Sequence, residues 1–316
     1  MARIRPHLGA LLAAILASVP AVAQPPALAD PDARIVDAFS GPAVRPLLVR
    51  PAQPAWWMVS NGSRTVHVLG VLWEFPAEQV WNQRQLNTRL RGVTFVLLPP
   101  VVIDRQARTP LQSGSGIPKE MQARFKQAAL SIGQDPARYE TLNPVTAGQL
   151  LISDFRNRLG LRPEAIVADV VRAATARDRD LRFAARLGDY SADRVRQTSP
   201  EGAAACLEAA LDEVEGGAAP VKTAVDGWMS GDVRRALQAP RGFERCSLAI
   251  SGYLALRETA VSAQVLTIRA HLDSRNAGAG DVVAVVELRS LLAEDGVLSR
   301  LERLGFKITP PEGADL

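Results

Sequence analysis

The chain has 316 residues, of which 47% are hydrophobic and 22% are charged. This composition is too apolar for a disordered chain, and two cysteines are too few for a disulfide framework. The formal charge of +4 falls to +2 without Arg3 and Arg5, and no polybasic cluster remains, so we do not expect nucleic acid as a partner.

The first 23 residues have the pattern of a secretory signal peptide. Arg3 and Arg5 form a basic start, residues 8–20 are apolar, and small residues precede a cleavage site after Ala23. The apolar run is shorter than the roughly twenty residues that span a bilayer, which disfavours an N-terminal membrane anchor. We expect a periplasmic or secreted protein with no transmembrane segment in its mature chain.

A proline-rich leader follows the signal peptide. Residues 24–54 contain seven prolines and show little periodicity, as expected of an extended segment. The domain itself is expected over residues 55–310, and residues 311–316 form a tail.

Apolar runs rich in β-branched residues predict strands near both ends of this domain. The first two flank Asn61-Gly62, a dipeptide typical of a two-residue type I′ hairpin turn. The third ends at Pro99-Pro100, whose missing N–H groups stop a sheet ladder. The predicted strands cover residues 56–60, 65–69, 93–98, 181–185, 281–286 and 306–309.

A polar loop is expected over residues 104–116, and the rest of the middle is predicted to be helical. Asn143-Pro144 and Ser199-Pro200 are typical of helix starts. The longest helix is expected to bend at Gly252, and Asp295 is expected to cap the last helix. The predicted helices cover residues 118–130, 144–159, 163–176, 200–216, 221–230, 243–275 and 296–304.

Strands near both ends with helices between them predict the fold class. We expect one α/β domain with a central mixed β-sheet, an opening β-hairpin and a large α-helical insertion.

Several segments are similar to those of a known family. Residues 54–70 look like the opening hairpin of the TraB/GumN family, which includes the Tiki peptidases, and residues 282–296 resemble its last strand and helix start. Trp228-Met-Ser-Gly-Asp232 is similar to the family's Trp-x-x-Gly-Asp segment, and Arg257-Glu258 stands where the family usually carries Arg-Asn.

The chain departs from the family where the resemblance implies a metal site of two Gly-x-x-His histidines and a strand-end glutamate. The first motif reads Gly70-x-x-Trp73, and the glutamate aligns with Leu98. The second motif falls on Glu287-x-x-Ser290. Indole and isobutyl groups offer no lone pair to a divalent ion. We therefore expect no metal and no other cofactor, and we expect Trp73 to be buried beside Leu98, filling the space of the ion.

Other residues could substitute for the lost ligands. Carboxylates at strand ends are usually solvated, however. His67 and His271 lie away from the motif positions, so we expect both histidines to be structural. No Gly-x-Ser-x-Gly or His-Glu-x-x-His motif offers another hydrolytic site. The possible substitutes are Glu74, Arg257, Glu258 and Glu287.

Cys206 and Cys246 are the only cysteines. In a chain with an export signal, such a pair is most simply a disulfide, here between two predicted helices. Two separate buried thiols are the alternative.

These observations favour an exported, catalytically inactive member of the family that binds a peptide, a glycan or an envelope protein. A metal-dependent peptidase or hydrolase with a rebuilt active site is the first alternative. A structural partner in polysaccharide export, suggested only by the resemblance, is the second.

Overall fold

The computed structural model describes residues 53–102, 116–187, 195, 197–274 and 280–311. The predicted signal peptide, nearly all of the leader, the tail and most of the predicted polar loop lie outside these ranges. Within them, no helix is long and apolar enough to cross a membrane.

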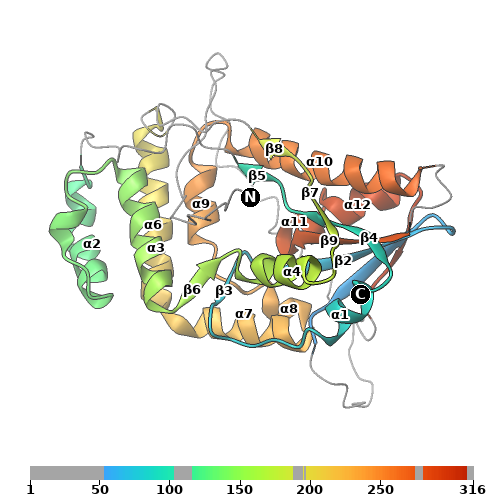
Figure 1. Ribbon diagram of the computed structural model, residues 1–316. Helices are drawn as coiled ribbons and strands as arrows, with labels where there is room; N and C mark the ends of the chain where they lie inside the picture. The colour runs from blue at the N-terminus through green and yellow to red at the C-terminus, as the bar shows by residue number, and fades with distance from the viewer. Residues whose placement is uncertain (1–52, 103–115, 188–194, 196, 275–279, 312–316) are drawn as a thin grey trace, which may run out of the picture.

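A six-stranded mixed sheet forms the centre of the molecule (Figure 1). Its strand order is β10-β1-β2-β9-β4-β7. The first three strands pair antiparallel, and the strands from β2 to β7 pair parallel. The strands are β1 (Trp56–Ser60), β2 (Thr65–Val71), β4 (Val93–Leu98), β7 (Asp180–Phe183), β9 (Asp281–Glu287) and β10 (Lys307–Thr309). The predicted mixed sheet is confirmed.

Helices cover both faces of the sheet, which explains why β9 is buried from Val282 to Val286. In Figure 1, α1 (Arg84–Arg89) and α4 (Ala165–Thr175) lie in front of the strands. The helices α10 (Tyr253–Leu272), α11 (Leu288–Leu292) and α12 (Val297–Arg303) lie behind them.

The predicted helical insertion forms a second hydrophobic core beside the sheet (Figure 1). Asn143 and Ser199 cap its two long helices as predicted, each accepting a hydrogen bond from a backbone N–H of the first turn. Its elements are α2 (Lys119–Ser131), η3 (Pro136–Arg138), α3 (Pro144–Arg158), α6 (Pro200–Gly216) and α9 (Gly242–Leu248).

Short elements link the two parts. The helices α7 (Ala218–Ser230) and α8 (Val233–Ala236) stand between α6 and α9 in the chain and pack against the core of the sheet. Two small ladders add β3 (Glu74–Pro76) paired with β6 (Leu161–Pro163), and β5 (Val101–Val102) paired with β8 (Arg186–Leu187).

The opening hairpin lacks the predicted two-residue turn. Ser60 pairs with Thr65, so four residues connect the strands. Asn61 Oδ1 accepts hydrogen bonds from the backbone N–H groups of Ser63 and Arg64, at 3.0 and 2.9 Å. This side chain closes a longer loop than a type I′ turn allows.

Two helix predictions were wrong. The pattern over residues 243–275 forms α9 and α10 instead of one bent helix, because Gly252 has φ of +82°, a left-handed conformation that interrupts the helical path. The last helix begins after Gly296. Asp295 pairs with Arg300 and Arg303 instead of capping it.

Candidate functional site at the carboxyl edge of the sheet

The carboxyl ends of the parallel strands meet at one edge, where ligands bind in open α/β sheets. Val71 at the end of β2 pairs with Glu287 at the end of β9. Leu98 is the last residue of β4 and is 2% exposed. The structure therefore brings Gly70, Leu98 and Glu287 to a common edge of the sheet, as the family motifs imply.

Gly70 lies where a side chain would collide with its neighbours. A Cβ there would lie 2.7 Å from Leu288 Cδ1 and 2.9 Å from Trp57 Cζ3. The Gly70 carbonyl also accepts a buried hydrogen bond of 2.7 Å from Trp228 Nε1. The glycine of the first motif thus has a packing role that does not depend on a metal.

The Trp228–Asp232 segment closes this end of β2. The indole of Trp228 packs edge-on against Phe75 and Trp81, with ring centroids 5.2 and 5.3 Å apart. Gly231 ends α7 with φ of +78°, and Asp232 caps α8. The space between this helical corner and Gly70 has no room for a water molecule.

Trp73 lies at the surface, so the prediction that it fills the former metal site was wrong. It is 37% exposed, whereas Leu72 and Phe75 are buried. The Trp73 carbonyl accepts a hydrogen bond of 2.8 Å from the backbone N–H of Glu164. The chain at this point buries Leu72 and Phe75 and places Trp73 at the outer position.

Glu74 belongs to a buried network of ion pairs. Arg156 Nη1 lies 2.9 Å from Glu74 Oε2, and Arg156 Nε lies 2.5 Å from Glu213 Oε1. Glu213 Oε2 also accepts a 2.7 Å hydrogen bond from the backbone N–H of Gly242. Burial raises the pKa of Glu74, although Arg156 acts in the opposite direction. The network joins β3, α3, α6 and α9, and no sequence motif had pointed to Arg156 or Glu213.

Glu287 caps α11 with its side chain. Its two carboxylate oxygens accept hydrogen bonds from the backbone N–H groups of Arg289 and Ser290, at 3.0 and 2.7 Å. Ser290 is therefore held through its backbone at the start of a helix. Each carboxylate oxygen of Glu287 therefore has one lone pair engaged with this helix terminus.

Arg257 and Glu258 contact different helices. Arg257 Nη1 lies 3.4 Å from Glu244 Oε1 of α9 and is mostly buried. Glu258 Oε2 lies 2.5 Å from Arg300 Nη2 of α12 and is largely exposed. The two residues of this motif therefore do not act on one group together.

His67 and His271 belong to the structural framework. His67 Nε2 lies 3.5 Å from Asp281 Oδ2, and the His271 ring packs edge-on against Phe95. Burial lowers the pKa of both histidines. The lowered pKa favours the neutral form of His271 in the last turn of α10 over a cation that would complement the helix dipole.

The residues present do not fit the metal that the family motifs imply. Trp73 and Leu98 lack donor atoms, and the carboxylates of Glu74 and Glu287 already have partners. Among the residues that the structure describes, no three His, Cys, Asp or Glu side chains are grouped to hold a metal ion.

Cys206 and Cys246 lie in the second core, and both are buried. Their sulfur atoms lie at disulfide distance and join α6 to α9. This placement agrees with the predicted pairing.

The fold and its carboxyl edge define a mixed α/β protein built on two motif-bearing strands, β2 and β9. A sequence model of the TraB/PrgY/gumN family matches residues 55–310. The chain belongs to this family. No curated protein and no solved structure gives a significant match.

Proposed function

We propose that this protein is an exported, catalytically inactive member of the TraB/PrgY/gumN family that acts as a binding or accessory protein of the cell envelope. The donor chemistry at the carboxyl edge supports this proposal. Trp73, Leu98 and Ser290 stand where the motifs imply metal ligands. The nearby Glu287 is engaged in capping a helix. Without a coordinated metal, the edge lacks the means to lower the pKa of a water nucleophile.

Metal analysis of protein purified from the periplasm tests this proposal. We expect no stoichiometric zinc, manganese or other divalent ion. Glu74→Gln and Glu287→Gln serve as matched variants, because these residues are the carboxylates nearest the motif positions. A content of about one metal per chain that is lost in either variant would contradict the proposal.

Exposed aromatic side chains support a peptide or a glycan as the ligand of this edge. Trp73 follows β2 and Phe183 ends β7, and they are 37% and 47% exposed. Exposed aromatic rings give large contact areas with little loss of conformational entropy. We propose that the ligand stacks on Trp73.

Binding to peptide and glycan arrays tests the role of Trp73. We expect Trp73→Ala to lose the signals of the wild-type protein. Leu266→Ala is the matched control, because Leu266 is a 61% exposed apolar side chain on α10. Equal losses in both variants would mean that Trp73 contributes only general surface hydrophobicity.

A hydrolase with a rebuilt site is the alternative, and one observation favours it. Burial raises the pKa of Glu74, as a general acid requires. Hydrolysis of a peptide by the wild-type protein that disappears in Glu74→Gln, with an unchanged denaturation midpoint, would establish this alternative and overturn the first proposal.

A further inference from the structure

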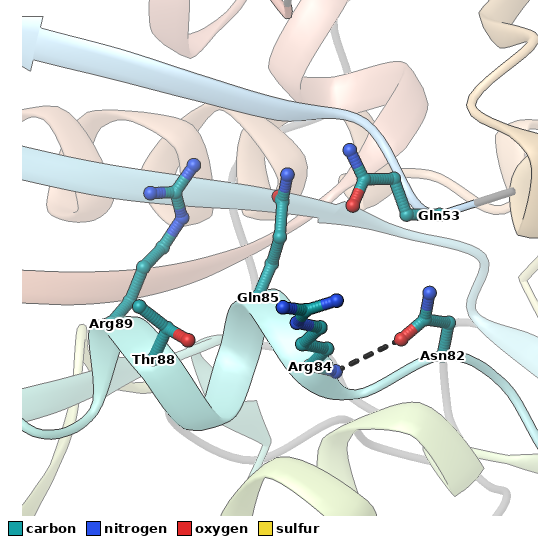
Figure 2. Close-up of a pocket in the computed structure, with 6 residues that line it drawn as sticks. All are labelled: Gln53, Asn82, Arg84, Gln85, Thr88 and Arg89. Atoms are coloured by element: carbon teal, nitrogen blue, oxygen red, sulfur yellow. Dashed lines mark hydrogen bonds between the residues drawn. The ribbon is translucent and has the colours of Figure 1, made fainter. Parts of the chain in front are cut away.

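A pocket lined by polar residue types lies beside α1, at the start of β1 (Figure 2). Its volume is about 350 Å³, within the range of small-molecule sites. Figure 2 shows Gln85 and Arg89 extending from α1 toward the level of Gln53. The lining residues are Gln53, Asn82, Arg84, Gln85, Thr88 and Arg89.

The described residues that line the pocket carry positive charge, and none of them is acidic. Arg84 and Arg89 contribute two guanidinium groups, and the other four lining residues are amides or a hydroxyl. Arg84 is exposed, and it forms no ion pair with any side chain in the described ranges. The pocket therefore favours an anionic guest with further hydrogen-bonding groups.

Two features prepare the pocket for such a guest. The guanidinium carbon of Arg89 lies 4.8 Å from the ring centroid of Trp56, and this stacking holds the cation in one orientation. Gln85 Oε1 is buried without a hydrogen-bond partner among the described residues. Rotation of this amide would let it bond to a guest, which removes the cost of an unsatisfied polar group.

We propose that this pocket binds a small carboxylate that carries hydroxyl groups, such as a uronic acid. Arg84 and Arg89 pair with the carboxylate, and the amides of Gln53, Asn82 and Gln85 bond to the hydroxyl groups. A planar guanidinium group pairs well with a carboxylate, and a side-chain amide both donates to and accepts from a hydroxyl. The site is separate from the proposed function, because its residues belong to α1 and to the segment before β1.

Calorimetric titration of the full chain tests the proposal with three probes. Sodium glucuronate carries the carboxylate and the hydroxyl groups, glucose carries only the hydroxyl groups, and inorganic phosphate supplies an anion without them. We expect saturable binding of glucuronate that is about tenfold tighter than that of either other probe. No saturable binding, or equal affinity for glucose or phosphate, would overturn the proposal.

Variants then assign the binding to the pocket. We expect Arg84→Gln to weaken glucuronate binding about tenfold, since it removes a charge-assisted pair from an exposed position that the fold does not need. Arg269→Gln on α10 is the matched control, because Arg269 is also an exposed arginine but lies outside the pocket. Equal affinity of the two variants would overturn the assignment.

His67 supplies a second readout in the same protein. Burial lowers the pKa of His67, and the positive charge of Arg89 lowers it further. Arg89 does not figure among the charges that act on His271, which are those of Arg64, Asp281 and Arg182. A carboxylate bound to Arg89 should therefore raise the pKa of His67 in an NMR titration and leave that of His271 unchanged. Equal shifts, or none, would overturn the role of Arg89.

Discussion

Trp73 and Trp228 both lie near the carboxyl end of β2, yet only Trp228 is buried. Trp73 is 37% exposed, so its replacement removes less buried surface than replacement of Trp228 does. We expect Trp73→His to lower the free energy of unfolding by no more than about 1.5 kcal/mol in urea melts. A loss of several kcal/mol would mean that the indole fills the former metal site after all.

Because Trp228 is buried, we expect its replacement to destabilise the protein more than replacement of Trp73 does. Trp228→Phe keeps a ring against Phe75 and Trp81 but removes the buried hydrogen bond to the Gly70 carbonyl. We expect it to cost about 1–3 kcal/mol in the same urea melts, because a buried polar group loses its partner. Trp73→Phe serves as the surface control. Similar midpoints for the two variants would contradict a structural role for the Trp228 hydrogen bond.

Charge pairs connect elements that no local sequence signal relates. Arg156 bridges β3 and α6, and its side chain and that of Glu213 are 12% and 1% exposed. Removing the cation leaves two carboxylates without a counter-charge in a poorly solvated place. We expect Arg156→Met to cost about 3–5 kcal/mol of unfolding free energy in urea.

Arg124→Met is the matched control for Arg156→Met. Arg124 pairs with Glu208, Asp212 and Glu215 across α2 and α6, but its side chain is 35% exposed. Water replaces these partners in the variant, so Arg124→Met should cost less than about 1 kcal/mol. Equal losses at both positions would show that burial does not set the strength of the network.

The pairing of Cys206 with Cys246 between α6 and α9 gives a prediction for protein purified from the periplasm. We expect free-thiol titration under denaturing conditions to detect almost no thiol before reduction and both cysteines after it. Reduction should lower the free energy of unfolding by about 4 kcal/mol, because the crosslink restricts the unfolded chain. Two titratable thiols in unreduced periplasmic protein would contradict this prediction.

The stability of the whole molecule should depend on pH through His67 and His271. Burial lowers the pKa of His67 and His271 below the ordinary value of 6.5. Between those lowered values and 6.5, the unfolded chain binds more protons than the folded protein. The free energy of unfolding should therefore have its full value above pH 6.5 and decrease as the pH falls below 6.5.

Urea melts at pH 7.5 and 5.5 check this expectation. The wild-type midpoint should be lower at the acidic pH, and the double variant His67→Gln, His271→Gln should lose much of that difference. Glu74 acts in the opposite sense, because a raised carboxyl pKa favours the folded protein as its carboxylate becomes protonated. A wild-type midpoint that rises on acidification would show that the histidines are not the controlling groups.

At every scale, the sequence by itself determined the features that depend on near neighbours. The caps at Asn143 and Ser199, the strand before Pro99 and the apolar run of β9 follow from side chains within a few residues of each other. Together with the order of the family motifs, these local signals were enough to predict the mixed sheet and the helical insertion. They also predicted that Leu98 is buried.

Only the tertiary structure decided which side chains share the interior. Leu72 and Phe75 are buried whereas Trp73 is exposed, and the partner of Glu74 comes from another element of the fold. Arg156 and Glu213 are separated by 57 positions along the chain. Burial and charge pairing depend on packing between distant segments, whereas caps and periodicity depend on local backbone geometry, so the sequence predicted the elements more fully than the site.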